Sequence, residues 1–261
     1  MHANLPSIHE ISTYLDNVLE TSSVRDYPGA VNGLQLENSG PIRAVTAAVD
    51  FSTRAIDAAI EADANLLVVH HGMFWGGAAP LKGASYNRLR KLFEHDIGVY
   101  SSHLPLDRHQ TYGNNVLLAK ELGLEPIASF AEYEGSSIGV RGNCDVDTST
   151  IIKRAEQFSR KYETSLRSTK VSKNRRTLHW AICTGAGASG DTLRDARELG
   201  IDTLIVGEGP HWTAVEAEEQ GLVVVYAGHY ATETLGVRAI AEHVAARYGI
   251  PSSFALASTG L

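Results

Sequence analysis

Three short segments carry side chains that commonly bind metal ions, and each follows an apolar run typical of a buried strand. In chain order, these side chains are His70, His71, His103, Asp107, His229 and Glu233. In open α/β sheets, ligands bind in the crevice outside the carboxyl ends of the strands. We therefore expect the three segments to converge in one cleft and to form a metal site there.

The spacing within the segments suggests two ions rather than one. If the strand continues through His70 and His71, their side chains point to opposite sides, so each can serve a different ion. His229 and Glu233 are four residues apart where a helix is expected to begin, so both can project from one face. A carboxylate in that position can bridge two metals, and Asp107 adds a second hard oxygen ligand.

Three imidazoles and two carboxylates leave two divalent ions with open positions, which is typical of catalytic rather than structural sites. A water held between ions about 3.5–4 Å apart becomes a nucleophile near neutral pH. The centre keeps a positive charge, which favours an anionic substrate such as a phosphate. The ligand types suit zinc, iron, manganese, cobalt or nickel and do not distinguish among them. Taken singly, a histidine at the end of a strand is more often a hydrogen-bonded structural residue. The set of three histidines and two carboxylates, taken together, favours metal binding.

The elements that must position these residues alternate between strand and helix along the chain. Helices are expected at 52–62, 87–95, 114–122, 148–161, 192–199, 214–220 and 234–248. Strands are expected within 65–72, 97–107, 136–143, 178–191, 201–212 and 222–233. This alternation predicts an α/β protein with largely parallel or mixed sheets. A length of 261 residues allows one large domain or two modest ones.

Composition excludes several classes of protein. The 23 basic and 30 acidic residues give a net charge of −7, which makes nucleic-acid binding unlikely. No apolar run approaches the ~20 residues that cross a bilayer, and residues 1–11 lack the features of a secretion signal. Two cysteines, Cys144 and Cys183, cannot form a disulfide framework. We therefore expect a cytoplasmic protein.

Four ordered motifs make the pattern specific: NGLQLE (32–37), LLVVHHGMFW (66–75), SHLPLDRHQTYGNN (102–115) and GEGPHWTAVEAEEQGLVVVYAGHYATET (207–234). With them the chain resembles the bacterial GTP cyclohydrolase 1 type 2 homologue family, whose eukaryotic members are known as interacting-factor-three-like proteins. The resemblance runs from about Val31 to Val244 in the same order.

The resemblance implies a dinuclear centre with two divalent ions per subunit, held by His70, His71, Asp107, His229 and Glu233. It implies two α/β domains, residues 1–125 with 224–261 and residues 126–223, with the metal site in the cleft between them. It also implies a homohexameric toroid. His103, four residues before Asp107, is a candidate proton shuttle or a partner that orients a ligand.

These observations predict a metal-dependent hydrolase that acts on a nucleotide-like or other phosphorylated small molecule. The family name suggests GTP, although no residue of the chain singles out GTP. The alternative is a non-catalytic metal-handling, storage or regulatory toroidal assembly, and a third hypothesis is an interaction scaffold.

Three further signals carry less weight. Gly185, Gly187 and Gly190 form a G-x-G-x-x-G pattern with Glu208 about 20 positions on, as in dinucleotide-binding folds. We favour a plain turn or a small anion-binding nest there. The basic run RSTKVSKNRR (167–176) reads as a solvated connection rather than a phosphate-binding patch. Trp75 and Trp212 follow candidate site loops and are candidates for the wall of a pocket for a planar base.

Overall fold

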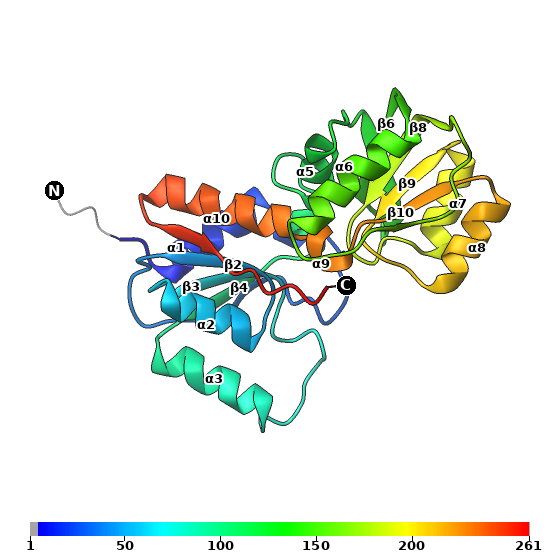
Figure 1. Cartoon of the computed structure of the whole chain (residues 1–261). Helices are drawn as coiled ribbons and strands as arrows, with labels where there is room; N and C mark the ends of the chain where they lie inside the picture. The colour runs from blue at the N-terminus through cyan, green and yellow to red at the C-terminus, as the bar shows by residue number, and fades with distance from the viewer. Residues whose placement is uncertain (1–4, 261) are drawn as a thin grey trace. The chain divides into compact units, whose positions relative to one another are not determined.

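The computed structural model describes residues 5–260 and divides the chain into two compact units (Figure 1). Among the described residues, unit 1 comprises 5–106 and Gly236–Ala257, and unit 2 comprises Asp107–Leu235 and 258–260. Unit 1 thus combines an N-terminal with a C-terminal segment, and unit 2 consists mostly of the middle of the chain.

These boundaries differ from the expected ones at three places. Residues 107–125, 224–235 and 258–260, which the sequence assigns to the first domain, lie in unit 2. The reason is packing, because the helix Asn114–Glu121 (α5) lies against the sheet of unit 2.

The sheet of unit 1 has five strands in the order β1-β4-β3-β2-β11. Their bounds are Gly33–Leu36 (β1), Val45–Asp50 (β2), Leu66–His71 (β3), Gly98–Ser101 (β4) and Ser252–Phe254 (β11). Strands β11, β2, β3 and β4 run parallel, and β1 pairs antiparallel with β4 at the edge. The three central strands are built mainly of buried apolar residues, as strands covered on both faces are, and most of their polar residues lie toward the carboxyl ends.

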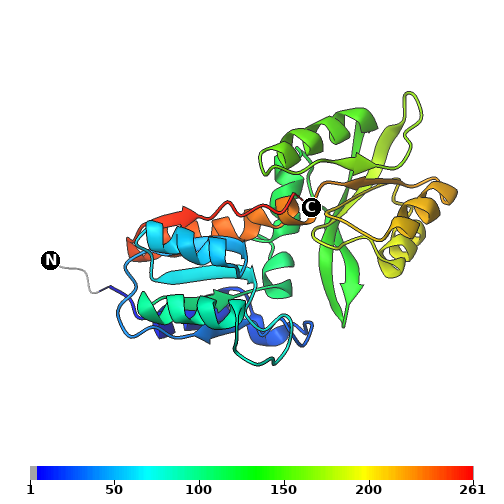
Figure 2. The ribbon, with the colours of Figure 1, turned by 60° about the horizontal axis from the view of Figure 1, so that its bottom comes forward.

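Helices cover both faces of this sheet (Figures 1 and 2). They are Ile8–Val18 (α1), Thr53–Glu61 (α2), Ala84–Glu94 (α3) and Thr234–Tyr248 (α10), which starts in unit 2 and continues into unit 1. A short 3-10 helix, Thr21–Ser23 (η1), follows α1. Helix α2 starts where the Ser52 side chain accepts a hydrogen bond from the Ala55 amide, and it buries Ile56 against the sheet. On the opposite face, the Tyr100 hydroxyl of β4 donates to Asp16 of α1.

Unit 2 contains a six-stranded sheet in the order β5-β6-β8-β9-β10-β7. The strands are Ala128–Tyr133 (β5), Ser136–Asp147 (β6), Arg167–Ser168 (β7), Arg176–Cys183 (β8), Thr203–Val206 (β9) and Val223–Tyr226 (β10). Strands β8, β9 and β10 are parallel, whereas β5, β6 and β7 join antiparallel at the two edges. Both sheets are therefore mixed, which confirms the predicted α/β class with a parallel centre in each sheet.

The helices of unit 2 are α5, Thr148–Arg160 (α6), Gly190–Glu198 (α7), His211–Glu219 (α8) and the short His229–Thr232 (α9). The short helix Leu104–Asp107 (α4) lies in unit 1 except for its last residue. Helix α7 begins with a capping box in which Ser189 and Thr192 bond each other's backbone amides. The core on one face joins Leu193 of α7 and Ala217 of α8 to alternate residues of β8, β9 and β10. Within residues 5–260, no helix is long and apolar enough to span a bilayer.

Candidate metal centre

In unit 1, the carboxyl ends of three parallel strands bring histidines and carboxylates to one edge of the sheet. Strand β3 ends at His71, and its neighbour β2 ends at Asp50, which is the register partner of His71. Strand β4 ends at Ser101, two residues before His103. Because parallel strands end together, side chains far apart in the sequence meet at this edge.

The three histidines of unit 1 form a cluster that suits a metal ion. One ring nitrogen each of His70, His71 and His103 lies within 4.8 Å of the others. The ring centroids are 4.8 Å apart for His70–His71 and for His70–His103, and 5.5 Å apart for His71–His103. His70 and His103 are buried, and His71 is half-buried. Although neighbouring strand residues alternate in direction, both β3 histidines reach this cluster, because the strand ends at His71.

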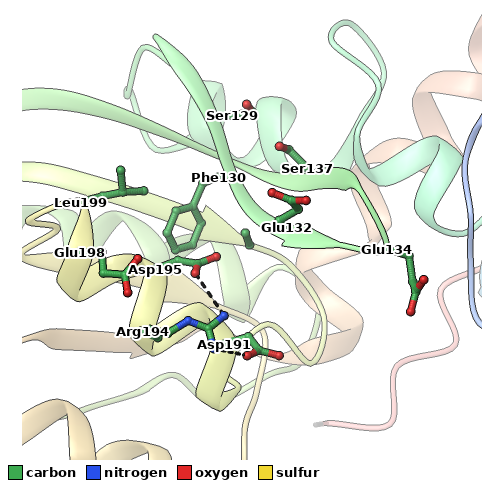
Figure 3. A pocket seen from close by; sticks show the side chains of 11 residues that line it. Ser129, Phe130, Glu132, Glu134, Ser137, Asp191, Arg194, Asp195, Glu198 and Leu199 are labelled. Atoms are coloured by element: carbon green, nitrogen blue, oxygen red, sulfur yellow. Dashed lines mark hydrogen bonds and ion pairs between the residues drawn. The ribbon is translucent and has the colours of Figure 1, made fainter.

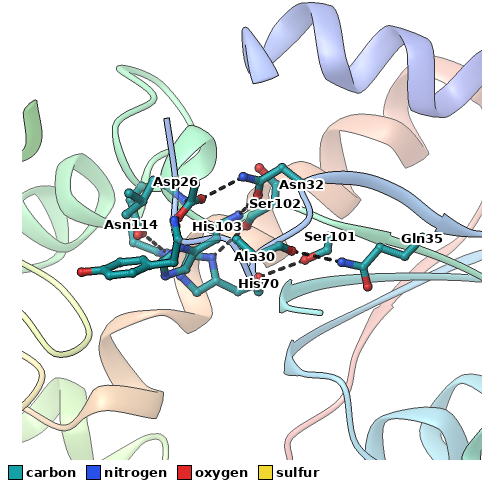
Figure 4. A network of polar contacts seen from close by, with 12 residues as sticks. Asp26, Ala30, Asn32, Gln35, His70, Ser101, Ser102, His103 and Asn114 are labelled. Atoms are coloured by element: carbon teal, nitrogen blue, oxygen red, sulfur yellow. Dashed lines mark hydrogen bonds and ion pairs between the residues drawn. The ribbon is translucent and has the colours of Figure 1, made fainter. Parts of the chain in front are cut away.

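Each ring in this cluster is oriented through its Nδ1 atom, and Figure 4 shows His70 and His103 with their partners Ser102 and Asp26. The Nδ1 of His71 donates to Asp50 Oδ1 at 2.8 Å, and that of His103 donates to Asp26 Oδ1 at 2.8 Å. The Nδ1 of His70 donates to the carbonyl of Ser102 at 2.9 Å. Histidines that bind metals almost always donate their other N–H to a carboxylate or a carbonyl, which places the lone pair on Nε2. The cluster has this arrangement at all three rings.

Asp26 anchors the loop beside the cluster. Its Oδ1 accepts from His103 and from the Tyr27 amide at 2.7 Å, and its Oδ2 accepts from Asn32 Nδ2 at 2.8 Å and the Leu104 amide at 2.9 Å. Burial acts to raise the pKa of Asp26, but the hydrogen bond and charge of His103, with the bonds from Asn32 and Leu104, outweigh it and lower that pKa. Asp26 is therefore a carboxylate at neutral pH, and it fixes the ring of His103.

We expect Asp50 to be a positioning residue whose loss weakens metal binding without removing a ligand. Asp50→Ala removes the acceptor of His71 Nδ1, so metal affinity should fall about 10- to 100-fold, the usual cost of losing such a partner. Asp50→Asn keeps an oxygen acceptor and should therefore lose less metal affinity than Asp50→Ala. Competition titration with a chromogenic chelator measures the affinity, and equal affinities for the wild type and Asp50→Ala would contradict the assignment.

Unit 2 places a second set of polar groups at the ends of its own parallel strands. Strand β8 ends at Cys183, Glu208 follows β9, and His229 follows β10. The backbone at Gly185 can lie against the carboxylate of Glu233 because glycine has no Cβ, which would overlap that carboxylate. Gly185 also takes a positive φ of 63°, which favours glycine. These turns bring Glu208, His229 and Glu233 together.

His229 lies between two carboxylates. Its Nδ1 donates to Glu208 Oε1 at 2.8 Å, and its Nε2 lies 3.1 Å from Glu233 Oε2. Burial acts to lower the pKa of His229, but the hydrogen bond and charge of Glu233, then those of Glu208, outweigh it and raise the pKa to about 9. The metal-free ring therefore carries a proton on each nitrogen at neutral pH. A metal bound at Nε2 must displace one of these protons.

Asp107 and Glu233 are the buried carboxylates of this unit's candidate ligand set. Asp107 Oδ1 accepts from Asn114 Nδ2 at 2.8 Å. Burial, followed by the negative charges of Asp107 and Glu233, raises the pKa of the Cys183 thiol to about 12. This thiol is therefore protonated at neutral pH.

The structure thus groups His70, His71 and His103 in unit 1 and places His229 against Glu233 in unit 2, whereas Asp107 is in neither group. The donor chemistry of both groups fits a divalent metal ion, because imidazole and carboxylate are common ligands of such ions. Sequence reasoning missed the role of the three carboxylates that orient the rings, Asp26, Asp50 and Glu208. Asp50 had a readable signal, because it ends an apolar run, as His71 does.

The glycine pattern of unit 2 packs against the protein's own atoms. A Cβ on Gly187 would overlap the Cys183 carbonyl, and the Gly185 position lies against Glu233. Glu208, the acidic residue that a dinucleotide site would need, instead bonds His229. This supports the plain turn over a dinucleotide site.

A separate hollow of about 520 Å³ in unit 2 lies between β5, β6 and α7 (Figure 3). The guanidinium of Arg194 there pairs with Asp191 at 2.7 Å and with Asp195 at 3.6 Å. The described residues that line this hollow include no histidine or cysteine. The metal-type ligands of unit 2 therefore lie at the ends of β8, β9 and β10 rather than here.

Comparison with known proteins gives one consistent family. The model of the family Duf34/NIF3 (NGG1p interacting factor 3) matches residues 6–256. A Deinococcus radiodurans protein named GTP cyclohydrolase 1 type 2 homolog is 36% identical over 90% of this chain and 88% of its own length. A Pyrococcus abyssi protein of the same name is 36% identical over 97% of this chain and 98% of its own. A crystal structure of a Thermus thermophilus protein has a TM-score of 0.83 and 33% identity, and the match covers 98% of this chain and all of that one.

Proposed function

The chain belongs to the Duf34/NIF3 family, and on that premise we propose that it is a dinuclear metal-dependent hydrolase of a nucleotide-like or other phosphorylated small molecule. His70, His71, Asp107, His229 and Glu233 hold two divalent ions in this proposal. One observation carries it: Nδ1 of His70, His71, His103 and His229 is bonded to a carboxylate or a carbonyl in every case. That arrangement leaves Nε2 of each ring as the atom that would bind a metal ion, although at His229 the ion would first have to displace the Nε2 proton.

Bound divalent ions supply Lewis acidity and lower the pKa of water, which suits attack on a phosphate ester or a purine ring. The chain's own residues hold and orient these ions: Asp50 fixes His71, Glu208 fixes His229, and the buried carboxylates balance charge. Two carboxylates against two divalent ions leave a positive site that favours an anionic substrate. His103, oriented by Asp26, moves a proton through its Nε2 in this scheme. The proposed assembly is a cytoplasmic homohexameric toroid.

Elemental analysis of protein purified without chelators tests the metal assignment. A ratio near two divalent ions per chain is expected, and a ratio near zero would overturn the proposal. The metal-loaded protein is then assayed for hydrolysis of phosphate esters and nucleotides, including GTP because the relatives carry that name. Turnover that disappears on metal removal and returns on reloading supports the hydrolase. A metal-replete protein that hydrolyses none of these phosphate esters and nucleotides supports metal handling instead.

A further inference from the structure

Two aromatic side chains stand exposed beside the histidine cluster of unit 1. Tyr27 is 46% exposed and Trp75 is 42% exposed. The Trp75 ring centroid lies 4.7 Å from that of His103 and 5.2 Å from that of His71. The Tyr27 ring lies 5.9 Å from His103 and 6.1 Å from Trp75. Large apolar surface thus faces solvent directly beside the candidate ligands.

Backbone contacts hold the two rings in place. The Tyr27 amide donates to the same Asp26 oxygen that orients His103, and the Ala30 amide donates to the Tyr27 carbonyl at 2.9 Å. Gly29 packs so closely on the next segment that a Cβ on it would lie 2.6 Å from the Trp75 carbonyl. The loop that carries Tyr27 is therefore locked both to His103 and to the segment that carries Trp75.

The angle between the rings indicates how they can bind a ligand. Their planes meet at 62°, so they form a corner rather than two parallel walls. A planar ring stacked on one face can meet the other ring edge to face, and both arrangements are favourable for aromatic pairs. Base–aromatic stacking contributes about 1–3 kcal/mol per base and tolerates different bases.

We propose that Tyr27 and Trp75 bind the planar heteroaromatic ring of the substrate, so that the substrate class is a nucleoside phosphate rather than a simple phosphate ester. This inference rests on the proposed function, because the metal centre takes the phosphate while the aromatic corner takes the base. It assigns specificity to two residues that bind no metal.

Binding of matched ligands tests this role. Isothermal titration of the metal-loaded protein compares GMP and AMP with ribose 5-phosphate, which shares the sugar phosphate and lacks the base. The wild type should bind at least one nucleotide more than about fivefold tighter than ribose 5-phosphate, the lower end of one stacking interaction. Trp75→Ala should abolish this preference and Trp75→Phe should keep part of it, while ribose 5-phosphate binding and metal content stay unchanged.

Phe74→Ala provides the matched control. Phe74 is the next residue in the chain and is 38% exposed, but its side chain lines a separate apolar hollow with Phe51 and Met73. This variant should keep the preference for the nucleotide. Trp212→Phe removes the other exposed tryptophan, and Trp180 is buried. In this variant, GMP should quench tryptophan fluorescence by contact with Trp75.

The results separate this inference from the proposal on which it rests. Equal affinity for the nucleotides and ribose 5-phosphate, or a preference that survives Trp75→Ala, overturns the aromatic corner and leaves the metal centre standing. Absence of nucleotide binding by metal-replete wild type also overturns it. Absence of metal from the wild type instead overturns the proposed function.

Discussion

Replacing Asp107 with asparagine is expected to lower the metal content of the purified protein from about two ions per chain to one or fewer. The amide has nearly the same shape as the carboxylate but carries no charge. Asp107 is buried, so little solvent screens the lost charge. Loss of an orienting partner costs about 10- to 100-fold in metal affinity, and loss of a direct ligand should cost more. Elemental analysis after dialysis against a fixed free-metal concentration measures the change.

Asp191→Asn is the matched control for this experiment. Asp191 is an exposed carboxylate of the same unit, paired with Arg194 at the start of α7. Its replacement changes the net charge by the same amount as Asp107→Asn and should leave two ions bound. If Asp107→Asn protein keeps two ions with the affinity of the wild type, Asp107 is not a ligand and the five-residue set is wrong.

Much of the fold can be predicted because the signal is local. Seven helices and six strands lie within or close to their expected ranges, and α10 matches at both ends. Helix α1 was missed although its buried residues Ile8, Ile11 and Leu15 have helical spacing. Strand β11, by contrast, carries no local signal. Its sequence is Ser-Ser-Phe, and it is a strand because it pairs with β2 across most of the chain length.

The candidate ligands could be predicted for a related reason, since each follows a recognisable strand. The carboxylates that orient them depend on tertiary structure. Asp50 meets His71 only through the β2–β3 register, and Asp26 reaches His103 from a loop 77 residues away in sequence. A pattern of residue types shows which side chains can bind a metal. Only the tertiary structure shows which carboxylates orient those side chains.

The burial of Asp26 leads to a large expected effect on stability. The side chain of Asp26 is 6% exposed, and each of its oxygens accepts hydrogen bonds from two N–H donors. In Asp26→Asn, either orientation of the amide places an NH₂ group against two of these donors. Leaving a buried donor without its acceptor costs about 1–3 kcal/mol. We expect the free energy of unfolding of the metal-free protein to fall by about 3 kcal/mol in urea denaturation, because two donors lose their acceptor.

Asp63→Asn supplies the contrast. Asp63 forms an ion pair with Arg43 at 2.9 Å, but its side chain is 85% exposed. Exposed pairs contribute about 0–1 kcal/mol, so this variant should unfold almost as the wild type does. Equal losses in the two variants would show that burial does not set the contribution of Asp26.

The pH dependence of the Asp26→Asn effect provides a second measurement. The pKa of Asp26 is lower in the folded protein than in the unfolded chain, so its carboxylate stabilises the fold fully above the unfolded value of about 3.9. This contribution is lost as the pH falls through the lower folded-state pKa. The stability difference between wild type and Asp26→Asn should therefore be constant from neutral pH to about pH 5 and should narrow below about pH 4. A difference that persists unchanged at lower pH would mean that the amide acts through packing rather than through the lost charge.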